Sequence, residues 1–480
     1  MRRLLLAGLL AAGPGTLVLA ACSVGPDYQR PATPAPLAWK EAGPWKDAAP
    51  RDAIAKGAWW ELFGDPLLSD LEAKADAGNP DLRAAVARVA QARAIARIAE
   101  ADFYPTISLD PTVQREQYSA TRPVQPGTVA KSYAANDFRV PLDLSYEVDL
   151  WGRVRRSVEA TTAVAEATVA SYETVRLALH ADVASAYFAL RSVDADRSVL
   201  RRTLDLRRES LRLAQARLRL GAGNDLDVSR AETELTTTEA ESIGLEKRRS
   251  ELEHALAALT GRPPAELSIP DKPLDLPPPA IPAGLPSELL ERRPDVAEAE
   301  RRLAASNAEI GIATAAYYPS LSLTAAAGFE SGDLKSLFDW KSRVWALGAG
   351  LAAPLYQGGR VDADVERARA RYEESVAQYR ARLLIAFQEV EDGLSGLRIL
   401  ADQAQVQARA VASSRKTADL TTSRYKAGLV SYFEVVDAER TVLQNEREAT
   451  LIQGQRLVTS VFLIKALGGG WQESSIHVHQ

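Results

Sequence analysis

The sequence predicts a mainly α-helical protein with two β-hairpins, in which two large halves of the chain are pseudo-equivalent. Three observations indicate this fold class: an internal repeat, two very long helical patterns, and four short runs of alternating apolar and polar residues.

The internal repeat is seen when the sequence is shifted against itself by 207 residues. Several glycines and arginines of the first half then coincide with the same residue types in the second half. The matching pairs include Gly152 with Gly359, Arg217 with Arg424, Gly221 with Gly428 and Gly261 with Gly468. Near the start of each half the offset is 214, which pairs Pro80-Asp81 with Pro294-Asp295. A repeated unit that cannot bury its own apolar face packs beside its copy.

The start of the chain has the pattern of a secretory signal that ends in a lipidation site. The positively charged Met1-Arg2-Arg3 is followed by an apolar stretch and then by Leu19-Ala20-Ala21-Cys22, which contains the only cysteine. Small residues before a cysteine fit a lipoprotein signal peptidase, so we expect residues 1–21 to be removed and Cys22 to carry acyl chains. The alternative is a structural or unused cysteine behind an ordinary signal. Ser23 stands where an aspartate would favour the inner membrane, which predicts a lipid-anchored protein of the outer membrane with a periplasmic extension.

Composition argues against several classes of protein. The net charge of −5 and the lack of a basic block argue against nucleic-acid binding. Four histidines and one cysteine leave little material for a metal site, and His180 and His254 have no partner at metal-ligand spacing. Gly468-Gly469-Gly470 precedes no helix, so it is not a phosphate-binding loop. We therefore expect no metal, no cofactor and no enzymatic activity.

The two repeats are expected to be separated by a proline-rich strap. Residues 23–58 are rich in proline, alanine and glycine and have the composition of an extended tether. The predicted segments are a signal peptide at 1–21, a lipidated N-terminal tether at 22–70, a first repeat at 71–261, the strap at 262–287, a second repeat at 288–468 and a C-terminal tail at 469–480.

Each repeat contains two runs with a period of two residues, which is typical of β-strands. The runs lie at 106–114, 138–150, 320–330 and 345–355. Each has about ten residues, the length at which a tilted strand crosses a bilayer, with one apolar and one polar face. After the predicted signal, no stretch approaches 18 uninterrupted apolar residues, so strands would have to make any membrane crossing. The alternative is a half-buried sheet of a soluble protein. The repeat offset changes by seven residues within the first hairpin, whose turn at 116–136 is therefore expected to point outward.

Long helices are predicted before and after the strands. A helix at 81–101 precedes the first hairpin, and helices at 153–220 and 360–426 follow the two hairpins. At about 1.5 Å per residue the last two would each be roughly 100 Å long, and apolar residues recur three and four positions apart, as in coiled coils. Each long helix ends at a glycine-containing turn and is followed by a return helix. The return helices are predicted at 225–260 and 432–467, with Asn224 and Ser431 as N-caps. The helix at 81–101 and the first return helix are expected to stack end to end.

Four strands cannot close a barrel, and open strand edges are not tolerated in lipid. Several chains must therefore share one barrel, and three chains would give twelve strands and twelve helical columns. The sequence thus predicts a homotrimer in which a transmembrane β-barrel continues into an α-barrel of long antiparallel helical hairpins.

Several motifs resemble the lipoprotein branch of the TolC-like outer-membrane factor family, over essentially the whole mature chain. They are Cys22-Ser23-Val24-Gly25-Pro26-Asp27-Tyr28, Trp59-Trp60-Glu61-Leu62-Phe63-Gly64-Asp65-Pro66, Arg293-Pro294-Asp295-Val296, Tyr318-Pro319 and Arg424-Tyr425-Lys426-Ala427-Gly428. The resemblance implies a trimeric exit duct that conducts small molecules such as drugs passively. It also implies two partners, a periplasmic adaptor (membrane fusion) protein and an inner-membrane efflux transporter. The alternative is a structural or adaptor coiled-coil lipoprotein, although adaptors usually carry one helical hairpin rather than two.

The resemblance also assigns roles at the two helical turns. It places the periplasmic gate just past the second turn, at Phe433, Glu434 and Asp437. The equivalent position to Asp437 in the first repeat is Arg230, and an Arg230–Asp437 contact is expected to hold adjacent helices closed. The small residues of the turns are expected to bind the adaptor. These turn residues are Gly221, Ala222, Gly223, Asn224, Gly428, Leu429, Val430 and Ser431. The exported compound cannot be deduced, because a passive duct takes its substrate from the pump behind it.

Overall fold

The structure is a computed structural model that describes residues 23–32, 36, 38–41, 57–123, 125, 129–274, 276–281 and 293–469. The predicted signal peptide, Cys22, part of the strap and residues 470–480 lie outside these ranges, so acylation of Cys22 stays a prediction. The chain divides into two compact units, which are described in turn. The first holds residues 1–31, 90–167 and 300–378, and the second holds residues 32–89, 168–299 and 379–480.

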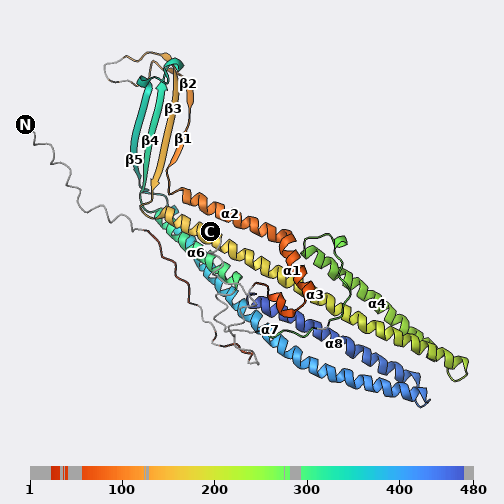
Figure 1. The fold of residues 1–480 in the computed structure, drawn as a ribbon. Coiled ribbons are helices and arrows are strands. Elements are labelled where there is room, and N and C mark those ends of the chain that lie inside the picture. The colour runs from red at the N-terminus through yellow and green to blue at the C-terminus, as the bar shows by residue number, and fades with distance from the viewer. Residues whose placement is uncertain are drawn as a thin grey trace, which may run out of the picture. The chain divides into compact units, whose positions relative to one another are not determined.

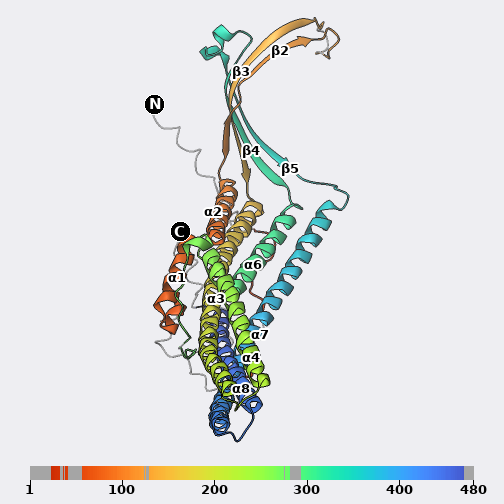
Figure 2. The same cartoon turned by 90° about the vertical axis from the view of Figure 1, so that its right-hand side faces the viewer.

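The first unit contains a five-stranded antiparallel sheet (Figures 1 and 2). Its strands are β1 (Thr106–Leu109), β2 (Thr112–Tyr118), β3 (Tyr133–Val148), β4 (Ser320–Ser331) and β5 (Arg343–Ala352). The order is β1-β3-β4-β5, and β2 pairs with the part of β3 that β1 does not reach. β1 and β2 therefore share one edge of the sheet, and β5 forms the other. The two predicted hairpins are confirmed, and they join through β3 and β4.

One face of the sheet carries nearly all of its large apolar side chains. The register places Leu142 of β3 opposite Leu109 of β1 and Ala327 of β4. Ala327 is in turn opposite Trp345 of β5. Because side chains alternate between the two faces of a sheet, every second residue of each strand joins this row on one face. The large apolar residues on it are Ile107, Leu109, Val113, Phe138, Val140, Leu142, Leu144, Tyr146, Val148, Leu321, Leu323, Phe329, Trp345, Leu347 and Leu351.

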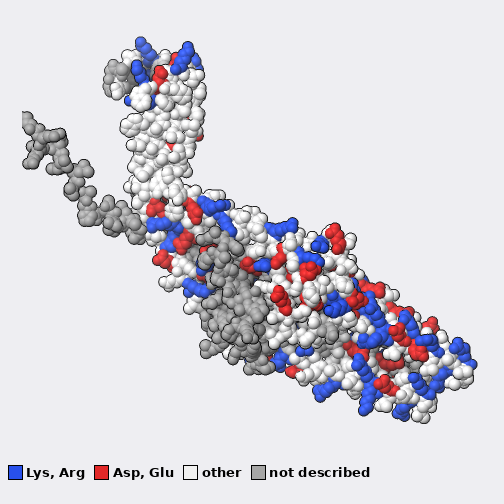
Figure 3. All heavy atoms as spheres, viewed as in Figure 1, with Lys and Arg blue, Asp and Glu red and all other residues white. Residues whose placement is uncertain are grey.

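The chain leaves much of this apolar face uncovered. Trp345, Leu347 and Leu351 are 74%, 77% and 68% exposed. In the view of Figure 3, charged side chains gather at the two ends of the sheet, and the surface between them is nearly free of charge. An uncovered apolar surface of this kind marks contact with a membrane or another protein.

The first predicted strand differs from the observed one. The run at 106–114 is divided into β1 and β2 by Asp110 and Pro111. Proline has no N–H group to donate to a neighbouring strand, which explains the interruption. Strand pairing also extends further into the loop than predicted, to Tyr118 opposite Tyr133. The predicted turn at 116–136 is therefore shorter.

The predicted tether is partly fixed to the helices of the first unit. A side-chain N–H of Asn307 donates to the carbonyl of Pro26 at 2.9 Å, and the Tyr28 hydroxyl donates to Glu300 at 2.5 Å. Gly25 has a φ of +95°, and a Cβ atom there would lie 2.5 Å from the Cα of Gly311. Residues 23–31 are thus held by specific contacts with α6 (Pro294–Ala315), which the composition alone did not indicate.

The helices have the same lengths in the two repeats. α3 (Arg153–Arg219) and α7 (Arg360–Lys426) have 67 residues each, and α4 (Asp225–Leu259) and α8 (Tyr432–Ala466) have 35 each. α2 (Pro80–Ala101) has 22 residues, as has α6. The predicted long and return helices are confirmed to within two residues at each end. Among the described residues, no helix combines the length and apolar character needed to cross a membrane.

In the second unit, the first return helix ends where the helix that precedes the first hairpin begins. The side chain of Asn79, just before α2, donates to the carbonyl of Leu259 at the end of α4, at 2.9 Å. At the equivalent positions of the second repeat, Arg293 donates to the carbonyl of Ala466 at the end of α8, also at 2.9 Å. Each side chain satisfies a carbonyl that has no partner within its own helix. The predicted end-to-end arrangement is therefore present, and it occurs in both repeats.

The second unit also contains η3 (Trp59–Phe63) and α1 (Pro66–Gly78). Trp59, Trp60 and Phe63 are buried, so this segment packs onto the rest of the unit. Trp60 lies against His180 of α3, with 4.4 Å between the ring centroids.

Candidate gate and docking site at the helical turns

The two helical turns have the same backbone structure. After α3 the N–H of Ala222 donates to the carbonyl of Arg217 at 2.9 Å, and after α7 the N–H of Leu429 donates to that of Arg424 at 2.9 Å. This six-to-one bond belongs to the Schellman motif, which needs a left-handed residue at the turn. Gly221 and Gly428 fill that position, with φ of +70° and +75°. A Cβ atom at either position would meet nothing within 4 Å, so glycine is required there by the backbone angle and not by crowding.

The two return helices begin differently. The side chain of Asn224 accepts the N–H of Asp227 at 2.8 Å, which confirms it as an N-cap. Ser431 occupies the same position before α8, but its side chain makes no capping bond. Ser431 is therefore the N-cap residue of α8, as predicted, but it lacks the side-chain bond that Asn224 makes. Its backbone carbonyl accepts the N–H of Glu434 instead, at 3.2 Å.

The predicted docking turns are exposed, and they carry apolar side chains as well as small ones. Ala222 and Leu429 both lie at the surface, and Leu429 is 69% exposed. Leu220 and Leu226, beside the first turn, are 83% and 56% exposed. Each turn therefore offers small residues for close approach and leucines that another helical hairpin could cover.

The predicted gate residues lie together on α8. Phe433, Glu434 and Asp437 line one hollow of about 530 Å³ between α7 and α8. Its other residues are small, hydroxyl-bearing or amide side chains: Ala410, Ser413, Ser414, Thr417, Thr421, Ala438, Thr441 and Asn445. Phe433 is 56% exposed, so its ring is available for contact with another molecule or another chain.

Arg230 contacts a different gate residue from the one expected. Its guanidinium carbon lies 5.5 Å from the centre of the Phe433 ring, which is the geometry of a cation–π contact. Within the part of the chain that the structure describes, Arg230 forms no ion pair with Asp437. The predicted Arg230–Asp437 contact is therefore not made within one chain, and Arg230 contacts the predicted gate residue Phe433 instead.

A buried ion cluster near the predicted gate residues was not predicted. Arg207 of α3 is 1% exposed, and its guanidinium lies 3.2 Å from Glu234 of α4 and 2.8 Å from Glu439 of α8. Arg440 of α8 also pairs with Glu234. Burial raises the pKa of Glu439 above its usual range, and Arg207 opposes that rise. Arg207 thus ties the first helical hairpin to the helix that carries the gate residues.

Arg217 makes a second connection between the hairpins, nearer the turns. Its guanidinium lies 4.7 Å from the centre of the Tyr425 ring and donates to the carbonyl of Tyr425 at 3.2 Å. Tyr425 and Tyr432 are part of an apolar cluster that closes the space between the hairpins. The buried members of this cluster are Ala214, Ala231, Tyr425, Tyr432, Val435 and Val436.

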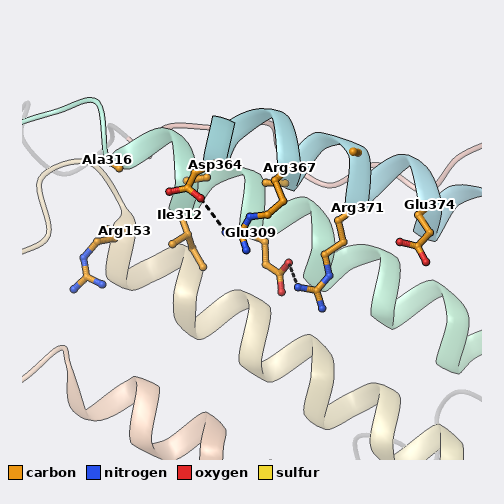
Figure 4. Close-up of a pocket in the computed structure, with 11 residues that line it drawn as sticks. Arg153, Glu309, Ile312, Ala316, Asp364, Arg367, Arg371 and Glu374 are labelled. Carbon is orange, nitrogen blue, oxygen red and sulfur yellow. Dashed lines mark ion pairs between the residues drawn. The ribbon is translucent and has the colours of Figure 1, made fainter. Parts of the chain in front are cut away.

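A larger hollow, of about 870 Å³, lies in the first unit and has the character of a structural groove (Figure 4). Alanines and Ile312 form much of its lining, and its charged side chains already have partners. Arg371 pairs with Glu309 at 3.1 Å, and Arg367 with Asp364 at 3.3 Å. A ligand would have to displace these pairs. Within the described residues, no group of three or more His, Cys, Asp or Glu side chains is placed to hold a metal ion.

Comparisons with known proteins agree with this geometry. A model of the outer membrane efflux protein family matches residues 71–262 and 285–469, which run close to the two predicted repeats. The toluene efflux pump outer membrane protein TtgF of Pseudomonas putida is 33% identical over 96% of each chain. The pyoverdine export outer membrane protein OpmQ of Pseudomonas aeruginosa is 34% identical over 95% of each chain. The solved structure of the outer-membrane channel OprN has a TM-score of 0.87 and 32% identity, and the match covers 94% of this chain and 100% of that one.

The apolar sheet face and the paired helical hairpins define a channel protein of the outer membrane. The chain belongs to the outer membrane efflux protein family. The family, the location and the role in efflux that the sequence predicted are thereby confirmed.

Proposed function

We propose that three copies of this chain form the exit duct of a tripartite efflux pump. The sheet carries the proposal, because its apolar face is uncovered and its edges, β1 with β2 and β5, have no partner strand among the described residues. In lipid such edges must be paired, and the strands of other copies can pair with them. With β1 and β2 counted as two parts of one edge strand, three copies provide twelve strands, and the long helices then line a periplasmic α-barrel.

Inter-chain crosslinking tests the trimer. Ser108 lies on edge strand β1, and Ala346, Gly348 and Gly350 lie on edge strand β5. Cysteine at 108, combined in turn with cysteine at 346, 348 or 350, is expected to give disulfide-linked dimers and trimers in outer-membrane fractions for the pairing that matches the barrel register. Cysteine at 326 replaces the β5 cysteine in the control, because Ala326 lies in the middle of the sheet on β4. Absence of linked species in every edge combination would contradict the shared barrel.

The proposed partners are a periplasmic adaptor at the two turns and an inner-membrane transporter behind it. The exposed leucines and small residues at Gly221–Asn224 and Gly428–Ser431 support this placement. A photo-crosslinker at Ala222 or Leu429 is expected to capture the adaptor, and one at Glu266, an exposed residue of the proline-rich strap, is expected to capture less. Crosslinks concentrated on the strap would show that the docking site lies elsewhere.

The gate is proposed at Phe433, Glu434, Asp437 and Arg230, at the periplasmic mouth. Three copies of each acid around one axis would repel one another and attract cations, and three phenylalanines would narrow the opening. The duct is proposed to be passive and non-enzymatic. The relatives named for toluene and for pyoverdine, two chemically unlike compounds, support a duct whose cargo is chosen by the pump behind it.

A further inference from the structure

The face of the sheet opposite the apolar side chains is polar and made of small residues. A hollow of about 360 Å³ lies on it at the level of Asp143 in β3. In the register, Asp143 is opposite Ser108 of β1 and Ala326 of β4, and Ala326 is opposite Ala346 of β5. Other residues of this face near Asp143 are Thr106, Ser145, Ser322, Thr324, Gly328, Gly348 and Gly350. Short side chains around it leave the Asp143 carboxylate open to the space in front of the face.

Asp143 differs from the nearest charged residues of β3 on this face, because each of those residues has an oppositely charged side chain close to it. On one side Glu147 pairs with Arg153 at 2.8 Å, and on the other Arg139 lies 3.9 Å from Glu330 across the strands. No ion pair to Asp143 is formed by the described residues. The middle of the polar face therefore carries the Asp143 carboxylate and, next to it, the exposed carboxylate of Asp110, which accepts a hydrogen bond from Ser108 at 2.8 Å.

We propose that Asp143 gives the β-barrel a cation preference of its own, separate from the one at the periplasmic mouth. The proposal rests on the trimeric duct proposed above. If the apolar face contacts lipid, the polar face lines the lumen, and three chains place three Asp143 carboxylates at one height.

The size of the barrel determines how this ring acts. Twelve strands about 4.8 Å apart and tilted by about 40° give a circumference of about 75 Å and a diameter of about 24 Å. After the short side chains are subtracted, each carboxylate lies about 9 Å from the axis, which is too far for three carboxylates to bind one ion together. At that distance the ring acts through its electrostatic potential, which salt screens with a Debye length of about 10 Å at 0.1 M and about 3 Å at 1 M.

The same distances give the size of the effect. Three charges at about 9 Å in water raise the cation concentration on the axis by a factor of about 2–3 in 0.1 M salt and by only about 1.1 in 1 M salt. Anions are depleted by the same factors. The ring therefore changes the cation-to-anion permeability ratio about five-fold in 0.1 M salt and hardly at all in 1 M salt.

The test is the zero-current potential of single channels in planar bilayers under a KCl gradient. The full-length protein carries Glu434→Gln and Asp437→Asn throughout, so that the two acidic residues of the proposed gate contribute no carboxylates. In this background Asp143→Asn is expected to lower the potassium-to-chloride permeability ratio about five-fold near 0.1 M KCl, and Asp143→Lys is expected to lower it further. Asp339→Asn, the same change in the exposed loop between β4 and β5, is the matched control and should have little effect.

The outcomes separate this inference from the proposed function. Failure of the parent protein to form channels would contradict the duct itself. Channels that form normally but whose selectivity near 0.1 M KCl is unchanged by Asp143→Asn would overturn the role of Asp143. If Asp143→Asn changed the permeability ratio by the same factor in 1 M KCl as near 0.1 M KCl, the long-range mechanism would be overturned, since salt must screen the potential of the ring at 1 M. Loss of the difference in 1 M KCl supports the inference.

Discussion

Replacing Arg207 with methionine is expected to open the periplasmic mouth and to raise single-channel conductance several-fold. Arg207 is 1% exposed and lies between Glu234 of α4 and Glu439 of α8. Removing one partner of a buried ion cluster leaves uncompensated charge, at a cost of about 3–5 kcal/mol. The structure relieves this cost when α8 moves away and water reaches Glu439. Since Phe433, Glu434 and Asp437 are on the same helix, the proposed gate moves with it.

Two further variants make this result interpretable. Arg208→Met is the matched control, because Arg208 is the next residue of α3 and pairs with Asp205 and Glu239 at the surface, where an ion pair is worth about 0–1 kcal/mol. Arg207→Met combined with Glu234→Gln and Glu439→Gln removes the buried charges together and should restore most of the closed state. A well-folded Arg207→Met trimer with wild-type conductance would show that the cluster does not hold the mouth closed.

The contact of Arg230 is expected to matter less than that of Arg207. An exposed cation–π contact such as that with Phe433 is worth about 0.5–1 kcal/mol. Arg230→Glu is therefore expected to raise conductance in the same bilayer recording by less than Arg207→Met does. A larger effect of Arg230→Glu would indicate that Arg230 has a partner in a neighbouring chain.

The sequence predicted the elements well because their signals are local. Alternation with a period of two assigned the apolar residues of each predicted run to one face, and the register confirms that assignment for the residues that lie in strands. The glycines at 221 and 428 marked the ends of the long helices, because few other residues adopt a left-handed turn. The break in the first strand was missed because an apolar proline at 111 fits the alternating pattern, although it cannot donate a hydrogen bond.

Contacts between distant segments could not be predicted in the same way. Glu439 is 232 positions from Arg207, and charged residues on a long polar helix are usually solvated. One local signal was available for Arg207. Leu200, Leu204, Arg207, Leu211 and Ala214 follow the spacing of three and four that marks the packed stripe of α3, so a charge on that stripe indicates a buried ion pair. The partner of Arg230 could not be read from repeat equivalence, because equivalent positions need not face each other.

The stability of the protein is expected to fall as the pH rises from about 5 to 8, because of a buried cluster around His180. The Nδ1 atom of His180 on α3 lies 2.7 Å from Glu72 of α1, and its Nε2 atom lies 3.2 Å from Asp76. Arg176, one turn earlier on α3, pairs with Asp76 at 3.1 Å and lies 3.9 Å from Glu173. Burial raises the pKa of Glu72 to about 7, although His180 opposes the rise. Burial lowers the pKa of His180, but its hydrogen bonds to Asp76 and Glu72 outweigh that effect and raise it above 6.5.

The raised pKa of Glu72 and the raised pKa of His180 change the stability in the same direction as the pH rises. A group whose pKa is raised on folding contributes stability that is present at low pH and lost as the pH rises through the folded pKa. For Glu72 that loss runs from about pH 4.5 to about 7, and each proton bound more tightly by the folded state changes the free energy of unfolding by about 1.4 kcal/mol per pH unit. For Asp76 burial raises the pKa, but hydrogen bonds from His180 and Arg176 hold it at about 2, so its contribution is lost only in strong acid.

Thermal unfolding of the full-length protein in detergent, followed by tryptophan fluorescence between pH 5 and 8, measures this slope. Glu72→Gln keeps a hydrogen-bond acceptor for His180 and removes the titrating carboxylate, so it is expected to flatten the decline between pH 5 and 7. His180→Ala leaves Glu72 buried without its partner and is expected to lower stability most above about pH 7, where Glu72 is ionised, by up to about 3–5 kcal/mol. His254→Ala is the control, because His254 is exposed on α4. If the stability of Glu72→Gln declines with pH as steeply as that of the wild type, the pH dependence belongs to other groups. If the decline is flattened, the contact that holds α1 to α3 weakens as Glu72 loses its proton.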